Sequence, residues 1–74
     1  MAQTIVPIEG SSMIAQLGYD PETNELDVQF LSNGSVYRYR DVEEDVYERF
    51  LAAASKGAFL NAHIKDAYLC ERVQ

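Results

Sequence analysis

The stretch that decides the fold is "ELDVQFLSNGSVYRYR", residues 25–40. Apolar and polar residues alternate over 25–31 and again over 36–40, and Asn33-Gly34 lies between the two runs. Alternation with a period of two is typical of a strand that buries one face. Asn-Gly tolerates the two positive φ angles of a type I′ turn, which joins two strands tightly. The sequence therefore predicts a β-hairpin with a two-residue loop.

A loop of two residues would also fix the register of the hairpin, because every strand residue then faces one partner. The expected pairs are Phe30–Tyr37 and Val28–Tyr39 on the apolar face, Leu31–Val36, Gln29–Arg38 and Asp27–Arg40 on the other face, and Ser32–Ser35 beside the loop. Leu26 lies beyond Val28 on the apolar face. Both tyrosines would then be core residues, and burying each ring would stabilise the fold by roughly 1.5–3 kcal/mol.

The alternation of Tyr37 and Tyr39 with Arg38 and Arg40 has a second interpretation, a surface for single-stranded RNA. Aromatic rings would stack on bases, and arginines would neutralise phosphates. In the expected register the rings and the cations lie on opposite faces, so they could not hold the same nucleotide. We therefore predict that the two tyrosines belong to the core, and the RNA hypothesis stays open.

The segments on either side of the hairpin are assigned by periodicity. They are an edge strand or extended arm over Thr4–Ile8, a strand over Met13–Tyr19, helices over Val42–Ala54 and about Ala58–Ala67, and a weakly alternating segment over Tyr68–Val73 that could return to the sheet edge. Asp41 and Glu44 have the spacing of a capping box for the first helix, and Gly57 suits a left-handed C-cap. The expected fold is α+β, a three- or four-stranded antiparallel β-meander with two C-terminal helices packed on one face.

Length and charge restrict the classes of function. With 74 residues and a hydrophobic fraction of 47%, residues 1–74 are expected to form one domain with a thin core. The net charge of −6 opposes non-specific attraction to nucleic acid. Residues 1–54 carry ten acids against three arginines, whereas residues 55–74 have a net charge of +1. The C-terminal third is thus the better candidate for contact with a phosphate.

Nothing in the sequence has the pattern of a catalytic or metal site. His63 is the only histidine and has no second ligand at metal-binding spacing. Cys70 has no sequence neighbour that would activate its thiol, and as the only cysteine it cannot form an internal disulfide. The apolar runs are too short to span a bilayer. We expect a cytoplasmic protein without enzyme activity, catalytic residues, cofactor, metal or membrane contact.

Several short motifs together resemble the KTSC domain, a small domain named for the C-terminus of some lysyl-tRNA synthetases and found also as a stand-alone bacterial protein. The motifs are Ser11-Ser12-x-Ile14, Gly18-Tyr19-Asp20, Leu26-x-Val28-x-Phe30, Gly34-x-Val36-Tyr37-x-Tyr39, Val42, Val46-Tyr47, Ala54-Ser55-Lys56-Gly57 and Asn61-x-x-Ile64-Lys65-x-x-Tyr68. The resemblance covers about residues 8–68. The chain departs from the family pattern at Glu43, where a proline is common, and at Leu60, where an aromatic residue is common.

The resemblance implies a binding module, with RNA as the ligand suggested by the occurrence of the family on synthetases and Tyr37-x-Tyr39 as its contact. Two hypotheses about the partner stay open. The candidate nucleic-acid contacts are Arg38, Lys56, Asn61, Lys65 and Arg72. The candidate protein or self-association interface is the apolar pair Leu31 and Val36 beside Arg38. The acidic net charge favours the protein partner.

Overall fold

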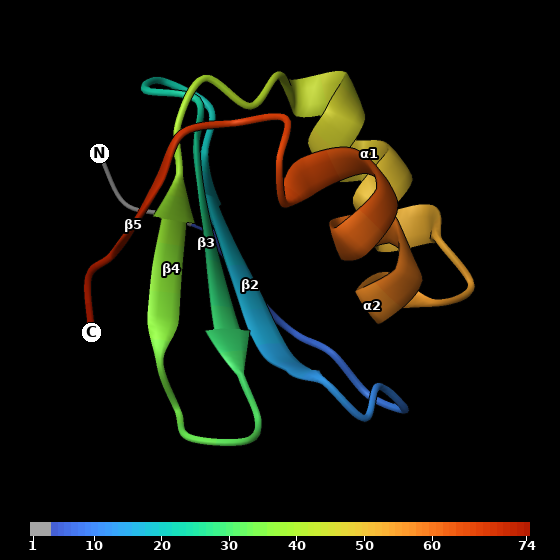
Figure 1. The fold of residues 1–74 in the computed structure, drawn as a ribbon. Coiled ribbons are helices and arrows are strands. Elements are labelled where there is room, and N and C mark those ends of the chain that lie inside the picture. Colours follow the sequence, from blue (N-terminus) through green and yellow to red (C-terminus); the bar gives the residue numbers. More distant parts are fainter. Residues whose placement is uncertain (1–3) are drawn as a thin grey trace.

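A computed structural model describes residues 4–74, which form one antiparallel sheet covered on one face by helices (Figure 1). The strands are β1 (Thr4–Pro7), β2 (Ile14–Asp20), β3 (Glu25–Phe30), β4 (Val36–Tyr39) and β5 (Cys70–Arg72), and they lie side by side in chain order. The helices are α1 (Glu44–Ala52), α2 (Lys56–Phe59) and the π-helical η1 (Leu60–Ile64) that continues α2. The predicted α+β meander is confirmed, with five strands instead of three or four, because both end segments pair with the sheet.

The hydrophobic core lies between the inner face of the sheet and the helices. Its buried members are Ile14, Leu17, Tyr19, Leu26, Val28, Tyr39, Val42, Tyr47, Phe50, Leu60 and Ile64. Tyr39 is only 4% exposed and therefore belongs to the core, as predicted from its strand face. Tyr37 is half-buried and packs against the edge of this core.

The register of the central hairpin differs from the prediction by two residues. The amide of Phe30 donates to the carbonyl of Ser35 over 2.9 Å, so the loop spans the four residues 31–34. The observed pairs are Leu26–Tyr39, Asp27–Arg38, Val28–Tyr37 and Gln29–Val36. Gly34 has a positive φ of 72°, but Asn33 does not, because the Asn33 side chain accepts the amide of Ser35 instead. A shift of two residues keeps every side chain on its predicted face.

The predicted capping box at the first helix is wrong. Asp41 has a left-handed φ of 62°, and the helix begins later, with Glu43 as its N-cap and no side-chain cap. The cause is Val42, which is completely buried. Its amide donates to the carbonyl of Asn24, and its carbonyl accepts the hydroxyl of Tyr19 over 2.5 Å. These bonds hold the chain against the sheet before the helix can begin.

Gly57 is not the left-handed C-cap that the sequence predicts. It lies in the first turn of α2, whose N-cap Ser55 accepts the amide of Ala58 over 3.2 Å. A Cβ atom at position 57 would lie 3.3 Å from the sulfur of Met13. The glycine therefore allows the helix to approach the start of β2 closely. The helical segment also begins earlier, at Lys56, and ends earlier, at Ile64, than the predicted range of 58–67.

Candidate binding groove

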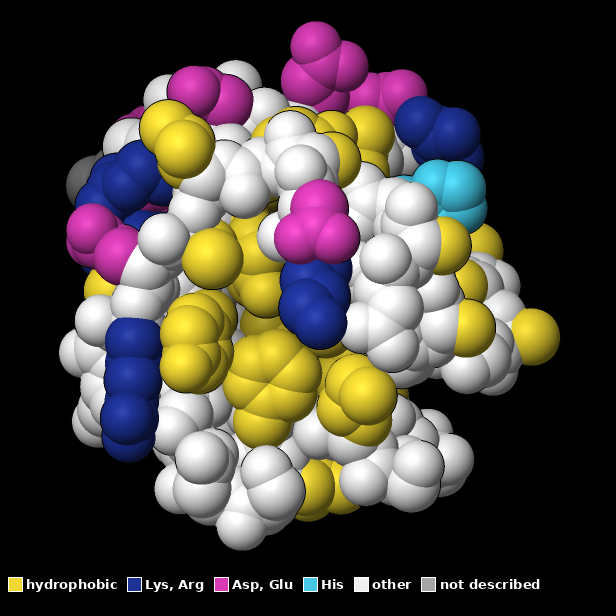
Figure 2. Space-filling model, in the orientation of Figure 1, with side chains coloured by type: hydrophobic (Ala, Val, Ile, Leu, Met, Phe, Trp, Pro, Cys, Tyr) yellow, Lys and Arg dark blue, Asp and Glu magenta, His cyan; other side chains and the backbone are white. Residues whose placement is uncertain are grey.

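An open groove lies between the inner face of β3, β4 and β5 and the helix η1. It has a volume of about 620 Å³. We call it the tyrosine groove, and its lining residues are Met13, Phe30, Ser32, Asn33, Tyr37, Tyr39, Leu60, Asn61, Lys65, Asp66 and Cys70. Figure 2 shows hydrophobic side chains gathered in a hollow on this face, with a cationic and an acidic side chain together at its edge.

The groove is lined mainly by aromatic and aliphatic side chains. The rings of Phe30 and Tyr37 pack edge to face, with centroids 5.7 Å apart and an interplanar angle of 81°. Tyr39 lies deeper, and its burial, reinforced by the nearby Cys70, raises the pKa of its hydroxyl. Tyr37 therefore provides the accessible ring of the Tyr37-x-Tyr39 motif, and Tyr39 mainly supports the fold.

The π-helical turn provides part of the polar rim of the groove, to which Ser32, Asn33 and Asp66 also belong. The amide of Lys65 donates to the carbonyl of Leu60 five residues before it, over 2.8 Å. Leu60 and Ile64 are buried in this turn, whereas Asn61 and Lys65 are exposed on the rim of the groove. A π turn inside a helix often marks a functional site, because it redirects side chains that an α-helix would place elsewhere.

Lys65 differs from the other cations of the protein. Arg49 lies 3.6 Å from Asp45, Lys56 donates to the carbonyl of Ala53, and Arg72 donates to the carbonyl of Gln74. The remaining arginines, Arg38 and Arg40, bind carboxylates on the opposite face of the sheet. Within residues 4–74, Lys65 forms no ion pair and no side-chain hydrogen bond, so its ammonium group is available beside the groove.

An ion-pair network covers the outer face of the sheet. Arg38 binds Asp27 through two hydrogen bonds of 2.8 and 3.0 Å, and Arg40 binds both Glu25 and Glu71. The hydrogen bond to Asp27 is the main reason why the pKa of Arg38 is raised. The sequence predicted Asp27 beside Arg40, and the two-residue register shift is the reason for the exchange. Arg38 is thus engaged within the sheet, away from Lys56, Asn61 and Lys65.

The apolar pair predicted on that face is not formed. Leu31 lies in the hairpin loop and is 52% exposed, whereas Val36 is half-buried in β4 and pairs with Gln29. The four-residue loop removes Leu31 from the strand, so the two side chains are no longer cross-strand partners.

Replacing Arg38 with alanine should lower the free energy of unfolding by about 1–2 kcal/mol. The substitution removes both hydrogen bonds to the Asp27 carboxylate. Because the Asp27 side chain is only 11% exposed, water would replace these bonds poorly. Urea unfolding followed by circular dichroism measures the change. Arg49→Ala is the control, because the Arg49–Asp45 pair is exposed and its loss should change stability by less than about 0.5 kcal/mol.

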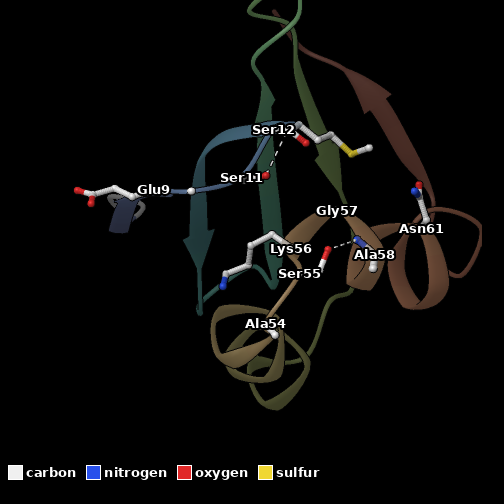
Figure 3. Close-up of a pocket in the computed structure, with 11 residues that line it drawn as sticks. Glu9, Ser11, Ser12, Ala54, Ser55, Lys56, Gly57, Ala58 and Asn61 are labelled. Carbon is white, nitrogen blue, oxygen red and sulfur yellow. Dashed lines mark hydrogen bonds between the residues drawn. The ribbon is translucent and has the colours of Figure 1, made fainter.

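A second, polar hollow of about 470 Å³ lies where the β1–β2 loop meets the start of α2 (Figure 3). Two of its three serine hydroxyls already accept backbone amides. Ser11 accepts the amides of Met13 and Ile14, and Ser55 accepts the amide of Ala58. Lys56 is placed here, apart from Lys65, and Asn61 borders both hollows. This hollow is therefore mainly a structural junction.

No three His, Cys, Asp or Glu side chains cluster in residues 4–74 as metal ligands would. His63 packs against the ring of Phe59, with centroids 4.7 Å apart, and Cys70 is an exposed free thiol. No helix in this part of the chain has the length and hydropathy needed to cross a bilayer.

These features define a class of protein: a small α+β domain with a meander sheet, helices on one face and an aromatic groove at their junction. Within this class, the chain belongs to the KTSC domain family, because residues 10–68 match that family. The resemblance inferred from the sequence motifs is thereby confirmed.

Individual relatives agree with this assignment. The crystal structure of a KTSC domain protein from Yersinia pestis superposes with a TM-score of 0.91 and 37% identity, covering 99% of this chain and 100% of that chain. An uncharacterized protein from Stutzerimonas stutzeri is 44% identical over 78% of this chain and 80% of its own length. A protein from Tsukamurella paurometabola is 39% identical over 84% of this chain and 90% of its own length.

Proposed function

We propose that this KTSC domain is a non-enzymatic protein-binding module that takes an apolar segment of its partner into the tyrosine groove. The observation that carries the proposal is the combination of an open apolar groove with the unpaired ammonium group of Lys65 on its rim. Aromatic rings that remain accessible beside one charged group are typical of recognition surfaces, because burying the rings contributes affinity and the charge selects the orientation.

The electrostatic balance favours a protein over a nucleic acid. The protein has a net charge of −6, and carboxylates neutralise Arg38 and Arg40 on the outer face of the sheet. A polyanion needs several free cations to displace its counterions. Lys56 and Lys65 line different hollows, so they do not form one basic site.

RNA is the second candidate, and one observation favours it. Asn61 and Lys65 line the same groove as the accessible ring of Tyr37. An amide, a cation and an aromatic face are the groups with which proteins bind a single unstacked nucleotide. On this hypothesis Arg72, which lies opposite Tyr37 in the register of β4 and β5, would contribute a second cation.

Site-specific photo-crosslinking in cells of the native host would distinguish these partners. A p-benzoyl-phenylalanine at position 61 lies on the groove rim, and the same group at the exposed position 48 on α1 is the matched control. We expect position 61 alone to yield adducts, which protease digests and ribonuclease leaves intact. Ribonuclease-sensitive adducts would support the RNA candidate instead, and equal adduct yields at both positions would contradict a function of the groove.

A further inference from the structure

The two edges of the sheet differ in how well they are protected against pairing with another chain. β1 contains Pro7, which has no amide hydrogen and disfavours a further strand. β5 has no proline, and all three of its residues are exposed. Two of the four exposed large apolar side chains in residues 4–74 flank it, Leu69 at 78% and Val73 at 39%, whereas β1 has one, Ile5 at 49%. Exposed apolar residues on an edge strand are typical of a site that pairs with another strand.

The backbone of β5 has free hydrogen-bonding groups on its outer side. The carbonyl of Leu69 accepts the amide of Arg40 over 2.9 Å, and the amide of Val73 donates to the carbonyl of Val36 over 2.8 Å. Hydrogen-bonding direction alternates along a strand. The amides and carbonyls of Cys70 and Arg72 therefore point away from β4, toward the open edge of the sheet.

The same edge borders the tyrosine groove. Cys70 lines the groove, and Arg72 lies opposite Tyr37 in the register, so both side chains are on the inner face of the sheet. A strand added beside β5 would place every second side chain on this inner face, next to the groove. Arg72 on β5 would then lie beside this strand and Lys65 across the groove from it, and each is a partner for a carboxylate.

We propose that the partner segment binds as a sixth, extended strand on β5, with alternate apolar side chains and at least one carboxylate directed toward the groove. This inference rests on the proposed function of the groove and specifies how the partner is bound. Strand addition supplies affinity through backbone hydrogen bonds, and side-chain pockets supply specificity. A second copy of this chain is disfavoured as the occupant, because two molecules of charge −6 repel each other.

A random dodecapeptide library on phage, selected against the full chain, would provide defined ligands. We expect the selected peptides to alternate apolar residues and to carry acidic residues. N-methylation of single amides in a synthetic selected peptide should weaken binding about tenfold at every second position and little at the positions between, because only alternate amides face β5. An equal loss of affinity at every methylated position, or no loss of affinity at any position, would overturn strand addition.

The protein side of the contact can be tested separately. Cys70→Pro removes one outward amide hydrogen at the first residue of β5, a position that accepts proline. It should weaken peptide binding about tenfold, whereas Cys70→Ala should leave it within about threefold. Lys65→Glu should weaken acidic peptides, and Arg49→Glu on α1 is the matched charge control.

The outcomes separate the two proposals. Selected peptides could crosslink at position 61 and yet keep their affinity after N-methylation and toward Cys70→Pro. This result would support binding in the groove and would overturn strand addition on β5. Selected peptides without acidic enrichment would overturn the proposed chemistry of the partner. A concentration-dependent dimer in sedimentation, abolished by Cys70→Pro, would show that a second copy is the occupant and would overturn the peptide partner.

Discussion

Replacement of Phe50 by alanine should lower the free energy of unfolding by about 3–5 kcal/mol and leave little folded protein at 25 °C. Phe50 is completely buried on α1, and its ring stacks on that of Phe59, with centroids 5.2 Å apart. The side chain thus joins the first helix to the second. A core of this size rarely supplies more than about 3–5 kcal/mol of net stability. The substitution would therefore remove most of the free energy of unfolding.

Urea unfolding followed by far-UV circular dichroism tests this expectation, with two variants as references. Glu48→Ala lies on the exposed side of the same helix and should change stability by less than about 0.5 kcal/mol. Phe50→Leu keeps most of the buried volume and should fall between wild type and Phe50→Ala. If Phe50→Ala lost less than about 1 kcal/mol, the packing of α1 on α2 described above would be wrong.

The faces of the strands could be predicted from the sequence, and their register could not. Side chains alternate with a period of two, so the shift of two residues in the hairpin leaves Tyr37 and Tyr39 on the apolar face. The register depends on the loop, and there Asn33 uses its side chain to bind the amide of Ser35. Asn-Gly therefore indicated a turn at the right place but not its length.

The groove could not be predicted, because it depends on where the second helix lies over the sheet. Gly57 lets α2 approach Met13, and the π turn places Asn61 and Lys65 on the rim. Neither effect has a local sequence pattern. The sequence did indicate that residues 55–74 are the better candidate for contact with a phosphate. It grouped Lys56 and Lys65 as contacts of one partner, whereas they line separate hollows.

The exposure of Tyr37 also depends on tertiary structure. Both tyrosines of the motif belong to one strand face, and periodicity assigns them the same environment. In the fold, Tyr39 is covered and Tyr37 borders the groove, so one motif contains a core residue and a candidate contact residue. The interpretation of the motif as core therefore applies to Tyr39, and its interpretation as a contact surface is compatible with Tyr37.

The second large effect that we expect is a steep loss of stability at alkaline pH, and its cause is the burial of three tyrosines. Burial raises the pKa of Tyr19, Tyr39 and Tyr47 above the ordinary value of 10.0. Below pH 10 these hydroxyls are neutral in both states, so their contribution to stability is fully present. Above pH 10 the unfolded chain releases its protons before the native state does, and stability falls as pH rises toward the native pKa values.

The expected slope follows from the number of groups. Between the unfolded and the native pKa values, each buried tyrosine should lower the free energy of unfolding by at most about 1.4 kcal/mol per pH unit, and the three together by at most about 4 kcal/mol per unit. Urea unfolding measured between pH 8 and 11.5 gives this slope. Absorbance of tyrosinate at about 295 nm should rise together with the loss of circular dichroism, because the buried groups ionise readily only after unfolding.

Tyr47→Phe is the decisive variant, because the Tyr47 hydroxyl is buried and forms no hydrogen bond with any residue in 4–74. Its removal should leave stability at pH 8 unchanged or slightly higher and should lower the alkaline slope by about one third. Tyr19→Phe should lower the slope equally but cost about 1–2 kcal/mol at pH 8, since the carbonyl of Val42 loses its donor. A wild-type slope in Tyr47→Phe would show that this tyrosine does not contribute to alkaline unfolding.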